Sequence, residues 1–124
     1  MLRVALLGAS GIASNYVASC QRVTGVEVCA IFSRSLERAK QFGQLHGISM
    51  ATDDLENLLA REDIHAFIIV TEPSRHIELA LQAMNHQKHL LIEKPIDVDY
   101  SKAVEFSGRV DDYEAVVSVV SQYR

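Results

Sequence analysis

Residues 3–13, RVALLGASGIA, decide the fold of this chain. The apolar run at residues 3–7 is followed at once by a glycine-rich turn and then by a longer stretch with the pattern of a helix. Gly8 permits a tight turn, Gly11 keeps the start of the helix uncrowded, and Ala13 lets helix and strand pack closely. The segment therefore predicts a strand, a tight turn and a helix in direct succession.

The turn compares with the G-x-G-x-x-G/A fingerprint, which places a pyrophosphate at a helix N-terminus. Ser10 stands where a glycine normally lets the backbone approach the ligand. Its Cβ pushes the ligand outward slightly, while its hydroxyl offers a donor. We interpret the turn as a modified fingerprint and expect a dinucleotide to bind at Gly8, Ser10, Gly11, Ile12 and Ala13. The alternative is a tight turn of small residues in a fold that binds something else.

Outward from this turn, short apolar runs alternate with longer amphipathic stretches. Strands are expected at residues 3–7, 26–32, 48–51, 66–70, 89–92 and 115–120, and helices at residues 11–24, 35–46, 53–60, 74–86 and 99–111. This alternation is typical of βαβ units, and continuous apolar runs suit parallel strands that are covered on both faces. The sequence predicts the α/β class, a Rossmann-type doubly wound parallel sheet of about six strands with helices on both faces. We expect residues 1–124 to form one NAD(P)-binding domain.

Several helix ends carry residues that favour a boundary. N-caps are expected at Ser35, Asp53, Ser74 and Asp99, and left-handed residues at the helix ends Gly25 and Gly47. Asp53 is followed by Glu56 three positions later, which resembles a capping box.

The composition excludes several classes of function. The 124 residues carry a net charge of −4 with 48% hydrophobic and 23% charged residues, and no basic run offers a surface for nucleic acid. No segment approaches the ~20 apolar residues of a membrane span, and no signal peptide is apparent, so we expect a cytoplasmic protein without a membrane partner. Cys20 and Cys29 read as small buried residues. His86 and His89 lack a third ligand, so no metal site is expected.

The adenosine end of the site is expected after the second strand. The acidic residue that reads the ribose stands about 20 residues beyond the fingerprint, where this chain has Ser33. A serine hydroxyl followed by the Arg34 guanidinium can take a 2′-phosphate, which favours NADP(H) over NAD(H) as cofactor. Arg38, one helical turn later, is a weaker candidate to cover the adenine or to add positive charge. The alternative is that Arg34 is a solvated residue at a strand end.

Two further segments follow predicted strands, TEPSRH at residues 71–76 and EKP at residues 93–95. With the glycine-rich turn, the SRSLERA segment and the KHLLIEKP string, they make the chain resemble the N-terminal domain of the Gfo/Idh/MocA oxidoreductase family from end to end. The resemblance implies that Thr71 and Pro73 line the cofactor trough. The family commonly has glycine where this chain has Gln87, and we expect the helix to lose a left-handed cap there.

The resemblance also implies roles at the reacting end of the cofactor. Glu93 and Lys94 would lie beside the nicotinamide ribose, with the Lys94 ammonium reaching the substrate oxygen as the catalytic group. A cation there stabilises developing negative charge or relays a proton during hydride transfer. Pro95 would fix the backbone that aims the lysine. His76 matches a family histidine for which a cofactor-side role and a packing or capping role are both open.

The resemblance also implies a C-terminal domain, which in family members binds the small-molecule substrate and supplies the acid-base residues. That domain is absent from these 124 residues, and we expect the full-length protein to be a homo-oligomer. The function expected is the cofactor-binding domain of an NAD(P)-dependent oxidoreductase that acts on a sugar, polyol or related hydroxyl or carbonyl compound. The alternative is a non-catalytic dinucleotide sensor or interaction module.

Overall fold

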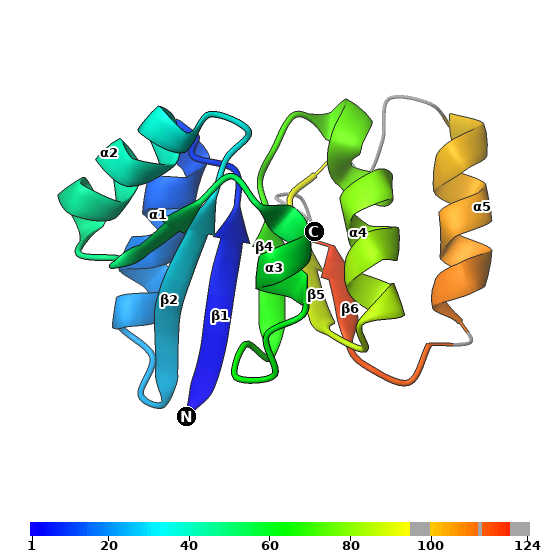
Figure 1. Ribbon diagram of the computed structural model, residues 1–124. Helices are drawn as coiled ribbons and strands as arrows, with labels where there is room; N and C mark the ends of the chain where they lie inside the picture. The colour runs from blue at the N-terminus through cyan, green and yellow to red at the C-terminus, as the bar shows by residue number, and fades with distance from the viewer. Residues whose placement is uncertain (95–99, 112, 120–124) are drawn as a thin grey trace.

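The computed structural model describes residues 1–94, 100–111 and 113–119. Within these described residues, six parallel strands form one sheet in the order β3-β2-β1-β4-β5-β6 (Figure 1). They are β1 (Leu2–Leu7), β2 (Val26–Phe32), β3 (Met50–Thr52), β4 (Ala66–Ile69), β5 (His89–Ile92) and β6 (Val117–Val119). The predicted class and sheet are confirmed.

Helices cover both faces of the sheet. They are α1 (Gly11–Gln21), α2 (Leu36–His46), α3 (Leu55–Leu59), α4 (His76–Asn85) and α5 (Tyr100–Val110), with a 3₁₀ turn η1 at Pro73–Arg75. Side chains of α1 and α2 pack with Leu6 and Ile31, whereas those of α3, α4 and α5 pack with Phe67 and Ile69. Figure 1 accordingly shows α1 behind the sheet and α3 and α4 in front of it. Burial from both sides explains why the strands read as continuous apolar runs.

The order of the strands reverses at β1. From β1 the chain adds β2 and β3 on one side, then crosses over and adds β4, β5 and β6 on the other. In open parallel sheets, ligands bind at such a switch point, outside the carboxyl ends of the strands. The segments that follow β1, β2 and β4 therefore meet at the place where a ligand is expected.

Two predicted N-caps, Asp53 and Ser74, are each wrong by one residue, because the structure has Asp54 and Arg75 in these positions. Asp54, not Asp53, caps α3, because its Oδ1 accepts from the Asn57 backbone amide at 3.1 Å. Helix α4 begins at His76 rather than at Ser74, because Pro73 opens a separate 3₁₀ turn. Ser35 is confirmed as the cap of α2, with its Oγ accepting from the amide of residue 38. Asp99 and Pro95 lie outside the described residues.

The left-handed positions correct two further expectations. Gly47 ends α2 with φ +73 as expected, but α1 ends at Gln21, and Gly25 lies in the turn before β2 with φ +88. Gln87 keeps a left-handed backbone with φ +62, so the expected loss of that cap is wrong. A side chain with a Cβ costs about 1 kcal/mol in this conformation relative to glycine.

Candidate functional site

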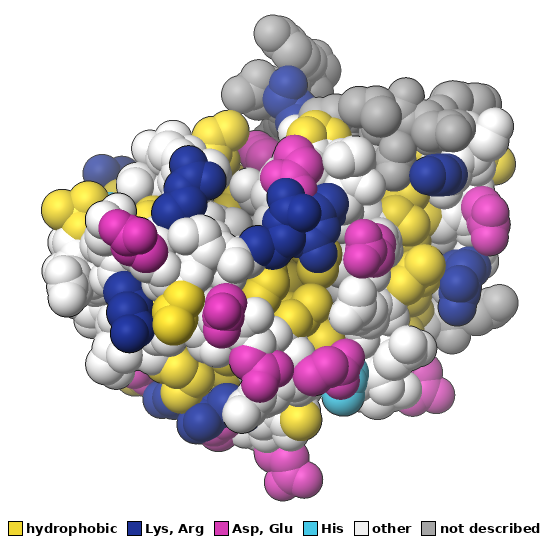
Figure 2. Space-filling view, turned by 45° about the horizontal axis from the view of Figure 1, so that its top comes forward, with side chains coloured by type: hydrophobic (Ala, Val, Ile, Leu, Met, Phe, Trp, Pro, Cys, Tyr) yellow, Lys and Arg dark blue, Asp and Glu magenta, His cyan; other side chains and the backbone are white. Residues whose placement is uncertain are grey.

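A cavity of about 420 Å³ opens at the carboxyl ends of β1, β2 and β4. Its walls are three segments that follow these strands: Gly8, Ala9 and Ser10; Phe32, Ser33, Arg34, Ser35 and Arg38; Val70, Thr71, Glu72 and Arg75. Figure 2 brings this edge of the sheet toward the viewer and shows Lys and Arg side chains gathered over its middle, with acidic side chains beside them. The cavity occupies the switch point of the sheet.

Gly8 lies directly against the end of β4. Its φ is +120, and an added Cβ would stand 2.9 Å from both the Thr71 nitrogen and the Val70 carbonyl carbon. Its own amide donates to the Phe32 carbonyl at 2.8 Å. Only glycine fits this turn, so the structural role predicted for Gly8 is confirmed, and its contact with a ligand stays a prediction.

The start of α1 is open in the way a pyrophosphate needs. An added Cβ at Gly11 would meet no atom within 4 Å, so packing within the protein does not require a glycine there. Ala13 is fully buried between α1 and the sheet, as expected. Ser10 makes no side-chain cap, and its hydroxyl instead donates to the Val70 carbonyl at 3.3 Å. The Ser10 side chain therefore leaves the first turn uncapped. The Ala13 amide donates to the Ser10 carbonyl at 3.1 Å, and uncapped amides at a helix start, such as those of Gly11 and Ile12, can bind phosphate.

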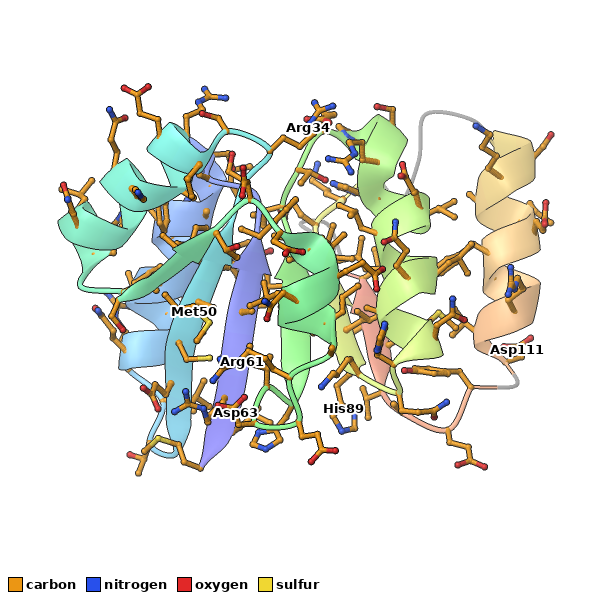
Figure 3. The ribbon with its side chains drawn as sticks, viewed as in Figure 1. Arg34, Met50, Arg61, Asp63, His89 and Asp111 are labelled. Carbon is orange, nitrogen blue, oxygen red and sulfur yellow. The ribbon has the colours of Figure 1, made fainter. Side chains whose placement is uncertain are left out.

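An ion pair joins two walls of the cavity at the end where the sequence predicts the adenosine. Arg34 Nη2 lies 3.2 Å from Glu72 Oε1, and the two side chains are 69% and 50% exposed. Figure 3 shows Arg34 at the upper edge, where the strands end. The Ser33 hydroxyl accepts from the Ser35 amide at 3.2 Å, and Arg38 lines the same wall. The structure thus brings the three predicted residues of this end together.

Sequence reasoning missed Glu72 and Arg75. Arg75 lines the cavity with a side chain only 18% exposed, and its Nε lies 3.9 Å from Glu78 Oε2. Among the described lining residues, the charged side chains are Arg34, Arg38, Arg75 and Glu72. This excess of positive charge suits a ligand with several phosphate charges. Both residues stand in TEPSRH beside predicted site residues, and their place after β4 was the signal that could have found them.

Glu93 lies at the end of β5, where the family resemblance predicts the reacting end of the cofactor. Its amide donates to the Ile69 carbonyl at 2.9 Å, and its Oε2 accepts from the Tyr16 hydroxyl at 2.9 Å. A second hollow of about 260 Å³ lies here and is lined by Ile12, Asn15, Tyr16, Ser19 and Glu93. Ile12 therefore faces this hollow. Lys94 follows Glu93 at the same edge and is exposed.

Burial first, and then the hydrogen bond to Glu93, raise the pKa of the Tyr16 phenol. Tyr16 therefore remains a protonated donor. It is a further residue of the site that the sequence did not reveal.

His76 lies underneath the segment that follows β4. It is 1% exposed, and its Nε2 lies 2.7 Å from the Thr71 carbonyl oxygen. Pro73 begins the 3₁₀ turn above it. This burial favours the packing role among the two that the sequence leaves open, with His76 holding Thr71 at the edge of the cavity.

The two histidines of the H-x-x-H spacing serve separate contacts. His86 Nε2 lies 3.9 Å from Glu56 Oε2, and His89 Nδ1 accepts from the Val116 amide at 3.0 Å. Within residues 1–94, 100–111 and 113–119, no three His, Cys, Asp or Glu side chains group closely enough to hold a metal ion. In the same residues no helix has the length and apolar character needed to cross a membrane.

The fold and the cavity define a dinucleotide-binding domain of the Rossmann type. The chain belongs to the Gfo/Idh/MocA oxidoreductase family, whose model, an oxidoreductase family with an NAD-binding Rossmann fold, matches residues 2–121. The family resemblance expected from the sequence is confirmed.

Individual relatives agree with this family. The chain is 32% identical over 102 residues to a 4-carboxy-2-hydroxymuconate-6-semialdehyde dehydrogenase from Sphingobium sp., which covers 82% of this chain and 32% of that protein. It is 35% identical over 95 residues to a scyllo-inositol 2-dehydrogenase (NADP(+)) from Bacillus subtilis, which covers 77% of this chain and 29% of that protein.

A solved structure shows the same architecture. The 3-ketoreductase from Actinomadura kijaniata in complex with NADP and TDP-benzene aligns with a TM-score of 0.84 and 27% identity, over 95% of this chain and 36% of that one. The chain thus spans about a third of the length of these relatives.

Proposed function

We propose that this chain is the cofactor-binding part of an NAD(P)-dependent oxidoreductase that acts on a sugar, polyol or related hydroxyl or carbonyl compound. The observation that carries the proposal is the cavity at the switch point, where a glycine turn and three arginines face one another. The named relatives, a scyllo-inositol dehydrogenase and a 3-ketoreductase solved with NADP, support the substrate class and the cofactor.

The residues present fit a nicotinamide dinucleotide. The turn at residues 8–13 would hold the pyrophosphate, because Gly11 leaves the space above the helix start open and the Ser10 side chain does not cap it. Ser33, Arg34 and Arg38 would bind the adenosine end and favour NADP(H) over NAD(H). Thr71 and Pro73 would line the trough, with His76 beneath them.

A bound nicotinamide supplies or accepts the hydride, and the chain orients it and handles charge beside it. Glu93, held by Tyr16, would position the nicotinamide ribose. The Lys94 ammonium would stabilise negative charge on the substrate oxygen or relay its proton. The small-molecule substrate would be held against this edge by a further domain, as in the family. The proposal includes a cytoplasmic, homo-oligomeric full-length protein, which cell fractionation and sizing would test.

Titration of the purified chain with NADPH and NADH tests the proposal. We expect NADPH to bind more tightly, and Arg34→Ala to weaken NADPH by about tenfold or more, since it removes a charge-assisted contact to the 2′-phosphate. NADH affinity should change by less than about twofold. The matched control is Arg109→Ala, an exposed arginine on α5 at the other end of the sheet. A folded chain that binds neither cofactor would contradict the proposal.

A further inference from the structure

A carboxylate stands opposite Arg34, although the end of β2 supplies none. The acidic residue of the usual fingerprint is replaced here by Ser33, and the structure brings Glu72 to the same end of the cavity from the segment after β4. Glu72 Oε1 lies 3.2 Å from Arg34 Nη2, across the end of β1. Both side chains line the one cavity, so any group that binds Arg34 there also meets Glu72.

We propose that Glu72 determines cofactor selectivity by competing with a 2′-phosphate for the Arg34 guanidinium. The inference rests on the proposed function and adds a selectivity residue to the same site. In the absence of a 2′-phosphate, Glu72 holds the guanidinium at the mouth of the cavity. A cofactor with a 2′-phosphate must displace the carboxylate, whereas a cofactor with a free 2′-hydroxyl leaves the pair intact.

The charges of the ligand give the competition its direction. A 2′-phosphate carries more than one negative charge near neutral pH, so Glu72 both occupies its partner and repels it. A ribose 2′-hydroxyl is neutral, and it can donate to a carboxylate. Glu72 therefore lowers the affinity for the cofactor with a 2′-phosphate. It leaves the affinity for the cofactor with a free 2′-hydroxyl unchanged or slightly raised.

The exposure of the pair sets the size of the effect. With 69% of Arg34 and 50% of Glu72 exposed, the ion pair is screened by solvent and can be displaced. Glu72 thus reduces the preference for a 2′-phosphate without abolishing it. Arg75, an arginine of the opposite wall, has Nε 3.9 Å from Glu78 Oε2 and so has a carboxylate of its own.

Two adenosine fragments isolate the effect. Adenosine 2′,5′-bisphosphate and adenosine 5′-monophosphate are titrated into the chain by calorimetry at low salt. Glu72→Gln should bind the bisphosphate about three- to fivefold more tightly, in the upper part of the range expected for releasing an exposed ion pair, because repulsion of the 2′-phosphate is relieved as well. Affinity for the monophosphate should stay within about twofold. In an Arg34→Ala background the gain should shrink below about twofold, because the Arg34 guanidinium is gone and only the direct repulsion by Glu72 is left to relieve.

Glu37→Gln is the matched control, since it removes the same charge from an exposed position on α2 outside the cavity lining. The inference would be overturned if Glu37→Gln gained as much affinity for the bisphosphate as Glu72→Gln. It would also be overturned if the ratio of bisphosphate to monophosphate affinity were unchanged in Glu72→Gln. Either result would leave the proposed function standing. A folded wild-type chain that binds neither fragment would overturn both. Circular dichroism of each variant establishes that it is folded.

Discussion

The Tyr16 hydroxyl donates a 2.9 Å hydrogen bond to the Glu93 carboxylate and so joins α1 to the end of β5, across 77 positions of the chain. The two residues line the hollow at the reacting end of the proposed cofactor site. Because burial and the neighbouring carboxylate raise the pKa of the phenol, the donor keeps its proton throughout the neutral range. Tyr16 thereby fixes the position of Glu93 without contributing a charge.

Tyr16→Phe should weaken binding of the whole cofactor but not of its adenosine end. Loss of one hydrogen bond of about 1 kcal/mol predicts roughly fivefold weaker NADPH binding. Affinity for adenosine 2′,5′-bisphosphate, which does not reach Glu93 in the proposed site, should be unchanged. Tyr113→Phe is the control, since its hydroxyl donates to the Lys88 carbonyl at 2.6 Å away from the cavity. If Tyr16→Phe weakened the binding of NADPH and of the bisphosphate equally, Tyr16 would act only through the stability of the fold.

Substitution by alanine should destabilise the fold strongly at Gly8 and only slightly at Gly11. Gly8→Ala puts a Cβ 2.9 Å from the backbone of Val70 and Thr71, which follow β4, at a φ of +120, so we expect a loss of about 2–4 kcal/mol in the free energy of unfolding. Gly11→Ala meets no neighbouring atom and should change that free energy by less than about 1 kcal/mol.

The same pair separates stability from binding. Gly11→Ala fills the space proposed for the pyrophosphate, so its affinity for NADPH should fall although the fold is intact. Urea unfolding and NADPH titration of both variants provide the measurements. Unchanged NADPH affinity in Gly11→Ala would place the pyrophosphate elsewhere.

The sheet could be predicted because burial on both faces requires a continuous apolar run in each strand, and each run can be recognised in the sequence by itself. The ends of the elements could not, because neighbouring residues offer similar chemistry. Asp53 and Asp54 both carry a capping carboxylate, and only the extended backbone at Asp54 decides between them. Ser74 resembles a cap, but Pro73 with its fixed φ begins a 3₁₀ turn one position earlier.

Only the parts of the site that lie within single segments of the sequence could be predicted. Residues that follow parallel strands meet at one edge, which is why the sequence places Gly8, Ser33 and Thr71 together. Which side chains then reach across that edge depends on packing between segments far apart in the chain. The contact between Arg34 and Glu72 joins positions 38 residues apart, and no local sequence pattern predicts it.

Asp63 should make the stability of the fold sensitive to acid. Arg61 donates two hydrogen bonds to it, at 3.0 and 2.7 Å, and holds the pKa of the Asp63 carboxyl below its ordinary value of 3.8. Figure 3 shows the two residues at the lower edge, opposite Arg34. A carboxyl whose pKa is lowered by folding stabilises the protein above 3.8, and this contribution is lost as the pH falls through the folded-state pKa.

Asp63→Asn should therefore be less stable than wild type at neutral pH, with a difference that is constant above about pH 5 and shrinks below 3.8. Urea unfolding at a series of pH values measures it. Arg61→Ala should lose most of the acid sensitivity, because it removes the largest cause of the lowered Asp63 pKa. A difference that does not vary with pH would contradict this assignment.

Lys88 should stabilise the fold from within. Its side chain is buried, and its Nζ donates to the carbonyls of Arg61 and Ile64, both at 2.6 Å. Lys88→Met keeps the length of the side chain but leaves two carbonyls without this donor. We expect a loss of about 2–4 kcal/mol in the free energy of unfolding. Lys40→Met, an exposed lysine on α2, should change it by less than about 0.5 kcal/mol.

The pH dependence distinguishes the lysine from a purely packing residue. Burial lowers the pKa of the Lys88 ammonium below its ordinary 10.5, so above the folded-state pKa the unfolded chain binds more protons than the folded one. Stability contributed by Lys88 must then rise with pH toward 10.5. The difference in unfolding free energy between wild type and Lys88→Met should widen over this range, since the tyrosines titrate in both proteins. A difference that narrows would mean that Lys88 is charged more readily in the fold than outside it.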